Sequence, residues 1–191
     1  MLIKNEFQVA EPVEKVWQFF QNIPQVATCL PGTALTEDLG GDQYQGTVAV
    51  RMGPVRLQFA GTADITERDE ANHRLVVHAS GAEAKGRGQA SMVVTATLAR
   101  TGGGTRVDVT QDLQLAGAAA QYGRGMISDV TAVLMHEFSA NLQDRIARID
   151  RGESLDAISA APARGFTLAL RAARMALARV FRRFFVPYQA V

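Results

Sequence analysis

The sequence has little of the chemistry on which most enzymes and metalloproteins depend. Its 191 residues include one cysteine, three histidines and one tryptophan. A single cysteine, Cys29, cannot form an internal disulfide. No HExxH, CxxC or nucleophile-elbow pattern is present, and no two residues stand out as a general acid and base. We therefore expect a protein that is not an enzyme, with no metal site and no covalent cofactor.

A secretory signal is also missing from the first residues. Lys4 and Glu6 interrupt the start of the chain, which holds no apolar run of signal-peptide length. Together with the single cysteine, this absence favours a reducing compartment. We therefore expect a cytoplasmic protein.

Acidic residues are absent from the C-terminal end. Residues 163–191 hold six arginines and no Asp or Glu, whereas residues 1–150 hold 13 Lys and Arg against 17 Asp and Glu. The stretch between them is small and polar, as is typical of a linker. The sequence predicts a domain at 1–150, a linker at 151–163 and a basic tail at 164–191.

The tail predicts an amphipathic helix. Its basic face comprises Arg164, Arg171, Arg174, Arg179, Arg182 and Arg183, and its apolar face includes Phe166, Leu170, Leu177, Phe181 and Phe184. Five arginines between Phe166 and Val186 make a membrane-spanning segment costly. A helix lying in the bilayer interface would bury its aromatic face and present its arginines to anionic lipid.

We predict that this tail binds the inner face of the cell membrane as a peripheral attachment. Packing on its own domain or in a groove of a partner protein is one alternative. Binding to nucleic acid is another, but the aromatic face disfavours it, and we expect no nucleic-acid partner.

The rest of the chain predicts an α+β fold, in which an antiparallel sheet is followed by a long helix. Apolar and polar residues alternate from Ile3 to Val9, as in a half-buried strand. A short helix is expected after Pro12, ended by Asn22 to Pro24, and turn signals then separate about six more strands. From 121 to 151 the period is helical, with an apolar stripe of Ile127, Val130, Leu134, Phe138 and Leu142.

Small residues fall on the face of the sheet that meets this helix. Side chains alternate between the two faces of a strand, and the inward set includes Gly46, Gly61, Ala63, Ala79, Ala90 and Ala96. One covering helix would not fill such a surface, which predicts an apolar cavity. Close helix packing or strand curvature is the alternative explanation. The polar residues Asn5, Tyr44 and Gln111 share the inward register and need partners, which would be each other, water or a ligand.

Several short motifs resemble those of one protein family. They are Pro12 with Val16-Trp17, Asn22-x-Pro24, Cys29-Leu30-Pro31-Gly32, Gly53-Pro54, Phe59-x-Gly61, Gly86-x-Gly88-x-Ala90 and Gly123-x-Gly125-Met126. Over residues 1–148 the chain resembles the CoxG family of carbon monoxide dehydrogenase subunits, within the helix-grip superfamily of polyketide cyclases and lipid-transfer proteins (SRPBCC, START-like). The resemblance implies a helix-grip fold. It also implies a non-catalytic accessory protein that recruits a molybdenum hydroxylase, such as carbon monoxide dehydrogenase, to the cytoplasmic membrane.

The cavity, the tail and the implied partner lead to a hypothesis about the ligand. A partner that must pass electrons to the respiratory chain favours a membrane quinone in the cavity, with menaquinone slightly preferred. The residues expected to line the cavity are Tyr44, Phe59, Met92, Gln111, Leu113, Met126, Val130 and Leu134. Gly123 and Gly125 weaken the start of the long helix, which would open the mouth. The alternatives are a membrane anchor without ligand, a cyclase-type enzyme and an assembly chaperone for the hydroxylase.

Overall fold

The structure is a computed structural model, and it describes residues 1–153. Its elements in chain order are β1 (Leu2–Val9), α1 (Val13–Gln21), α2 (Ile23–Cys29), β2 (Thr33–Gly40), β3 (Gln43–Met52), β4 (Val55–Asp69), β5 (Arg74–Glu83), β6 (Gly88–Thr101), β7 (Gly104–Gly117), the 3-10 turn η1 (Ala118–Gln121) and α3 (Arg124–Asp150). The predicted tail at 164–191, with all of its arginines and aromatic residues, lies outside the described residues. Most of the predicted linker at 151–163 lies outside them as well.

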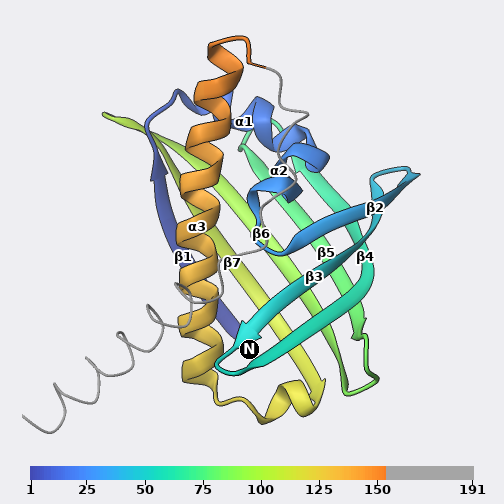
Figure 1. Cartoon of the computed structure of the whole chain (residues 1–191). Helices are drawn as coiled ribbons and strands as arrows, with labels where there is room; N and C mark the ends of the chain where they lie inside the picture. The colour runs from blue at the N-terminus through green and yellow to red at the C-terminus, as the bar shows by residue number, and fades with distance from the viewer. Residues whose placement is uncertain (154–191) are drawn as a thin grey trace, which may run out of the picture.

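All the strands belong to one seven-stranded antiparallel sheet in the order β1-β7-β6-β5-β4-β3-β2. Short turns connect β2 through β7 as a meander, and β1 pairs with β7. Figure 1 shows the sheet curving around α3, while α1 and α2 lie across one end. The predicted helix-grip fold, an α+β arrangement of about seven strands around a long C-terminal helix, is confirmed.

Two short helices follow β1. Pro12 precedes α1, as predicted, and Asn22 ends it. Asn22 also begins α2, because its side-chain oxygen accepts a hydrogen bond of 3.2 Å from the Gln25 N–H. Pro24 then fits the first turn, where its missing N–H leaves no bond unmade. The predicted helix stop is therefore a junction between two helices.

The long helix α3 begins at Arg124, later than the predicted start at residue 121. Residues Ala118–Gln121 form η1 instead, and Gly123 is extended as the N-cap of α3. The predicted apolar stripe faces the sheet, because Ile127, Val130, Phe138 and Leu142 are buried and Leu134 is packed in the cluster that contains Ile127 and Val130. Within residues 1–153, no helix is long and apolar enough to cross a bilayer.

The interior contains two apolar clusters. The larger cluster joins α1, α2 and the later turns of α3, where the Phe138 ring lies 5.8 Å from that of Phe7 and 6.3 Å from that of Phe20, both in edge contacts. The smaller cluster surrounds the first turns of α3 and includes Met52 and Ile127. Residues of both clusters border the site described next.

Candidate ligand-binding site

A cavity of about 300 Å³ lies between the sheet and α3. Strands β2 to β7 form one wall, and α3, η1 and Leu30 form the rest of the lining. The large apolar side chains of the lining are Leu30, Leu35, Val48, Val50, Met52, Leu57, Phe59, Met92, Leu113, Leu115, Ile127, Val130, Leu134 and Met135. Because such a surface offers few hydrogen bonds, the cavity suits an apolar ligand.

Small residues that lie side by side across the sheet leave the space for this cavity. One row of paired positions comprises Gly46, Gly61, Gly81 and Ala90. A Cβ atom on Gly61 would lie 1.9 Å from the Ser80 carbonyl oxygen, so the close approach of β4 and β5 requires glycine there. The small residues therefore serve both strand curvature and the cavity. Ala96, which was predicted in the same set, is instead buried in the larger cluster.

Several polar side chains of the lining form no hydrogen bond with residues 1–153, and three of them belong to residues that are buried or whose polar atom is buried, namely Thr33, Tyr44 and Gln111. Gln111 is 6% exposed and Tyr44 is 8% exposed, and neither side chain is paired there. Thr33 Oγ1 is buried and also without a partner. A completely buried polar atom without a partner, which here is Thr33 Oγ1, costs about 1–3 kcal/mol. A ligand that forms hydrogen bonds with these groups would remove that cost.

Tyr44 and Gln111 can both donate a hydrogen bond to an oxygen of a ligand. Burial raises the pKa of the Tyr44 phenol, and the carboxylates of Asp38 and Asp42 raise it further, so the phenol keeps its proton at neutral pH. The Gln111 amide supplies N–H donors as well as one acceptor. Tyr44 lies on β3 and Gln111 on β7, with three strands between them. The two groups therefore reach the cavity from different sides of the curved sheet.

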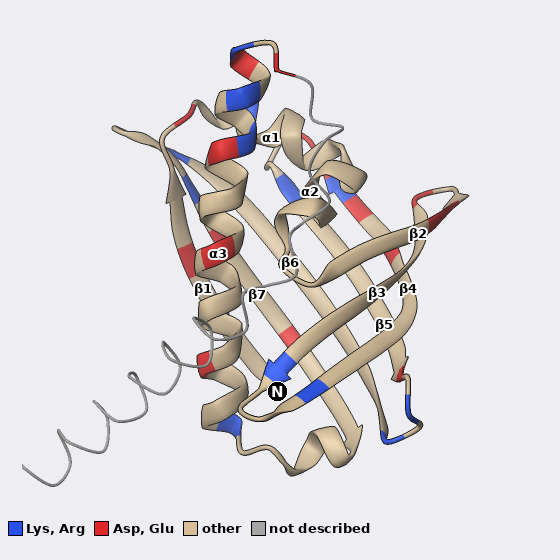
Figure 2. Ribbon diagram, in the orientation of Figure 1, with Lys and Arg blue, Asp and Glu red and all other residues tan. Residues whose placement is uncertain are grey.

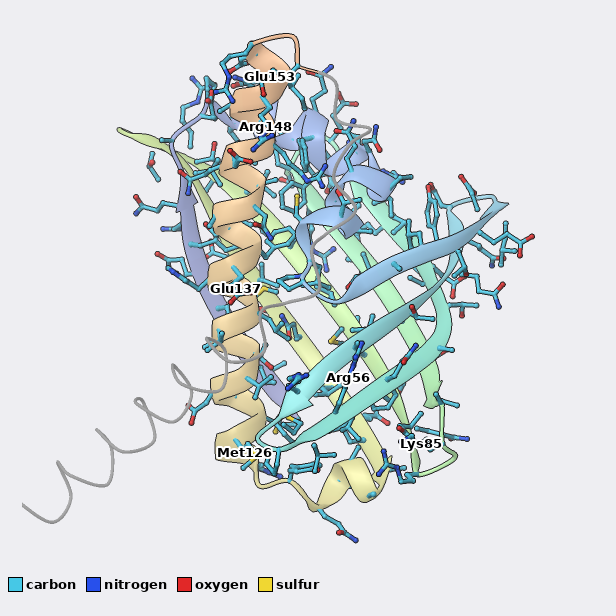
Figure 3. All side chains as sticks on the ribbon, viewed as in Figure 1. Arg56, Lys85, Met126, Glu137, Arg148 and Glu153 are labelled. Carbon is cyan, nitrogen blue, oxygen red and sulfur yellow. The ribbon has the colours of Figure 1, made fainter. Side chains whose placement is uncertain are left out.

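The structure brings together all but one of the residues predicted to line the cavity, namely Tyr44, Phe59, Met92, Gln111, Leu113, Val130 and Leu134. The prediction for Met126 was wrong, because its side chain is 46% exposed and lies outside the cavity. Met126 belongs to the first turn of α3, at the edge of the molecule (Figure 3). Ile127, about 100° further around the helix, takes the inward position instead.

Sequence reasoning missed the connection between α2 and β2. Leu30, Thr33 and Leu35 of this region line the cavity. The connection turns at Gly32, where φ is +76° and a Cβ atom would lie 2.3 Å from the Ala49 carbonyl oxygen. The motif Cys29-Leu30-Pro31-Gly32 was the available signal, because it places a buried cysteine and a positive-φ glycine on either side of Leu30.

Charged side chains do not reach the cavity that residues 1–153 form, since its lining includes no Asp, Glu, His, Lys or Arg. In the same part of the chain, no group of His, Cys, Asp or Glu is placed to hold a metal ion. Proton transfer by the described lining would depend on the neutral Tyr44 phenol. The arrangement is suited to binding through apolar contact and a few hydrogen bonds.

Known proteins share this fold over most of the chain. The family model for CoxG, a subunit of carbon monoxide dehydrogenase, matches residues 6–147. A conserved protein from Geobacillus kaustophilus has a TM-score of 0.69 at 19% identity, over 78% of this chain and 96% of its own. The ZhuI aromatase/cyclase from Streptomyces sp. R1128 has a TM-score of 0.57 at 14% identity, over 81% and 99%. No match was found among curated proteins. At these identities the structural likeness shows the fold alone.

Proposed function

Because the chain belongs to the CoxG family of carbon monoxide dehydrogenase subunits, we propose that it is a non-catalytic accessory protein which recruits a molybdenum hydroxylase of the carbon monoxide dehydrogenase type to the cytoplasmic membrane. In this proposal the cavity binds a membrane quinone, with menaquinone slightly preferred. The protein then carries the quinone between the membrane and the enzyme. The family comprises accessory subunits associated with carbon monoxide dehydrogenase.

The polar groups of the cavity are the observation that supports a quinone. A quinone ring carries two carbonyl oxygens that accept hydrogen bonds, and it has no donor of its own. The Tyr44 hydroxyl and the Gln111 amide are donors without partners among residues 1–153. Apolar contacts with Phe59 and the other lining residues would supply most of the affinity, at about 25 cal/mol per Å² buried.

In this proposal the ring lies near Tyr44 and Gln111, and the isoprenoid chain points toward the smaller cluster. Tyr44 packs in the larger cluster beside α1 and α2, whereas Phe59, Leu113 and Leu134 pack with the smaller one. The cavity volume of about 300 Å³ lies at the lower end of the range for small-molecule pockets. We therefore expect the ring and the first isoprene units to fill the cavity, with the rest of the chain extending outward.

The start of α3 is the segment that would open the cavity. Its N-cap is Gly123, which offers no side-chain hydrogen bond, and Gly125 follows in the first turn. Arg124 places a cation where the helix dipole favours an anion. Ile127 and Val130 of the next turn line the cavity, so fraying of this weak turn would move part of the wall.

The tail at 164–191 supplies the membrane attachment in this proposal. Its aromatic face would lie in the bilayer interface and its arginines would bind anionic headgroups. A domain held in this way stays where quinones are dissolved, and its partner enzyme is held there with it. Flotation of the full chain with anionic vesicles, with and without residues 163–191, tests this part, and equal flotation of both forms would contradict it.

Solvent extraction and mass spectrometry of the purified full chain test the quinone. Ala79→Leu places a larger side chain in the cavity, and Ala82→Leu adds the same atoms to an exposed position of the same strand. We expect the wild-type protein and Ala82→Leu to retain quinone, and Ala79→Leu to retain about tenfold less because overpacking costs 1–3 kcal/mol. An absence of quinone from all three proteins would contradict the proposal.

The alternative functions make different predictions. For an anchor without ligand, added quinone leaves the melting temperature unchanged, whereas a quinone-binding domain is stabilised by mass action. A cyclase-type enzyme needs an acid and a base, and the described lining offers Tyr44 alone among titratable side chains. An assembly chaperone would bind the apo-hydroxylase in preference to the mature enzyme.

A further inference from the structure

Basic residues gather at one end of the sheet. The hairpins β3–β4 and β5–β6, the end of β7 and the start of α3 all lie at this end, because the sheet is an antiparallel meander. Figure 2 shows Lys and Arg on these segments, and at the opposite end it shows Lys and Arg mixed with Asp and Glu. We call this region the basic end and define it by Arg51, Arg56, Lys85 and Arg124.

The residues of the basic end lack ion-pair partners within residues 1–153. Basic residues elsewhere in this part of the chain are mostly paired, as Arg68 is with Asp42 and Arg148 with Asp144. Even Arg87, the neighbour of Lys85, is bonded to Glu83. None of the four defining residues forms an ion pair with an acidic residue of the described part of the chain. Their charges are therefore available to an anion of another molecule.

Local electrostatics make two of these positions unfavourable in the free protein. Arg51 and Arg56 lie directly opposite each other across β3 and β4, and both are exposed. Like charges in such a cross-strand pair destabilise a sheet. Arg124 begins α3, where the helix dipole repels a cation. An anionic surface placed against this end would relieve both effects.

Apolar side chains are exposed beside these cations. Met126 is 46% exposed in the first turn of α3, and Leu2 is 61% exposed at the start of β1, on the same end of the sheet. Figure 3 shows Arg56, Lys85 and Met126 at this end, and Arg148 and Glu153 at the opposite one. A surface that combines unpaired cations with exposed apolar side chains matches the interface of an anionic bilayer, where each has a partner.

We propose that the basic end is a membrane contact of the folded domain, which binds the phosphates of anionic phospholipids through Arg51, Arg56, Lys85 and Arg124 and inserts Met126 among the headgroups. The tail would determine how tightly the chain is held, and the basic end determines which way the domain faces. This inference rests on the proposed function in one respect. That respect is ligand entry from the membrane. The proposed contact turns the cavity wall formed by Ile127 and Val130 toward the bilayer, so that an apolar ligand passes from lipid to cavity without crossing water.

A fluorescent probe on single introduced cysteines tests the orientation of the full chain. Met126→Cys reports on the basic end, and Asn72→Cys reports on the exposed β4–β5 turn at the opposite end. Cys29 is completely buried and stays unlabelled in the folded protein. On vesicles of equal parts phosphatidylcholine and phosphatidylglycerol, we expect a blue shift and quenching by lipid-borne quencher at position 126 alone. Melting temperatures equal to that of the wild type confirm that both labelled proteins are folded.

Charge reversal then identifies the residues that make the contact. Arg51→Glu with Arg56→Glu should lower vesicle partitioning by about tenfold or more, because each basic residue near the surface contributes about 1 kcal/mol. It should also abolish the response at position 126. Arg100→Glu with Arg106→Glu makes the same change of charge at the opposite end and should leave both readouts unchanged.

Three results would overturn the proposal. The first is a probe at position 126 that stays in water while the full chain floats with vesicles. The second is an equal loss of vesicle partitioning in the two charge-reversal variants. The third is an Arg51/Arg56 reversal that weakens binding to the hydroxylase and leaves vesicle partitioning unchanged. Quinone retention is measured separately. If the protein retains quinone but the probe stays in water, the proposed function holds and the membrane contact does not. If the cavity is empty but the probe inserts, the membrane contact holds and quinone binding does not.

Discussion

The Glu83 carboxylate accepts a hydrogen bond of 3.1 Å from the Arg87 guanidinium, although the Glu83 side chain is only 2% exposed. The backbone N–H groups of Lys85 and Arg87 donate to the same carboxylate. The Arg87 carbonyl in turn accepts a hydrogen bond of 2.7 Å from the Ala118 N–H of η1. These bonds join the β5–β6 hairpin to η1, whose Ala119 lines the cavity beside the weak start of α3.

Acid should weaken the fold through Glu83. Its hydrogen bond with Arg87 is the largest cause that lowers the pKa of the carboxyl from 4.5 to about 2. A carboxyl with a lowered pKa stabilises the fold while it is ionised, so its contribution is complete above pH 4.5 and is lost as the pH falls toward 2. Denaturation at a series of pH values should show a larger loss for wild type than for Glu83→Gln. Arg87→Gln should reduce the loss as well, and identical pH curves for the three proteins would refute this role.

Removal of the Gln111 amide should separate stability from ligand binding. Gln111→Leu replaces an unpaired buried polar group by an apolar one, so the free energy of unfolding without ligand should stay the same or rise by about 1 kcal/mol. Quinone affinity should fall by about five- to twentyfold, because one hydrogen bond to the ring is lost. Gln114→Leu changes an exposed position of the same strand and serves as the control. Equal quinone affinity in the two variants would show that the amide does not contact the ligand.

A methyl group at Gly61 should strain the sheet. Its Cβ atom would lie 1.9 Å from the Ser80 carbonyl oxygen and 2.5 Å from the Gly81 Cα atom, so the strands must move apart. We expect Gly61→Ala to lower the free energy of unfolding by about 1–3 kcal/mol. Gly102→Ala meets no atom within 4 Å and should change it by less than about 0.5 kcal/mol. Thermal and chemical denaturation measure both, and a Gly61→Ala protein as stable as wild type would mean that the curvature does not depend on this glycine.

Cys29 should be inert in the folded protein. Its thiol is completely buried and donates to the Gln25 carbonyl oxygen at 3.5 Å. Burial raises the pKa of this thiol to about 12, so a thiol reagent should modify it about a thousandfold more slowly than in the unfolded chain. The Asn141 amide holds the Cys29 carbonyl oxygen at 2.9 Å, joining α3 to α2. Asn141→Ala should therefore increase the rate, and a native rate equal to the unfolded rate would contradict the burial.

Periodicity predicted most of the residues that the strands present to the cavity, although Thr62 and Ser80 of the opposite register also border it. The predicted inward residues of β4 from Leu57 to Ala63 line the cavity. The irregular pairing of β4 with β5 falls between Ile65 and Glu67, beyond the cavity. A bulge a few residues earlier would have turned every later side chain to the other face. The resemblance to the CoxG family, which rested on short motifs, is confirmed over residues 6–147.

Features that depend on distant parts of the chain were beyond local patterns. Met126 fits the helical spacing of the stripe, but that spacing does not reveal that α3 begins at Arg124 and leaves Met126 at the edge. Leu30 reaches the cavity from a connection without periodicity, and Thr33 reaches it from the first position of β2. Whether the side chains of Tyr44 and Gln111 form hydrogen bonds depends on neighbours that the fold brings together from other elements, which no run of neighbouring residues specifies.

The four cations of the basic end are unpaired within residues 1–153, whereas most cations at the opposite end are paired with Asp or Glu, so the basic end is the positive end of an electric dipole. Near an anionic bilayer, such a dipole experiences a torque before any atom touches lipid, over roughly the Debye length of about 8 Å at physiological ionic strength. A domain tethered by its tail would thus return to the same orientation after each thermal excursion. Salt would shorten the range of this torque, so that the domain would face the bilayer in the productive orientation less often. Ionic strength would then regulate the frequency of ligand exchange, even where the amount of membrane-bound protein stays constant.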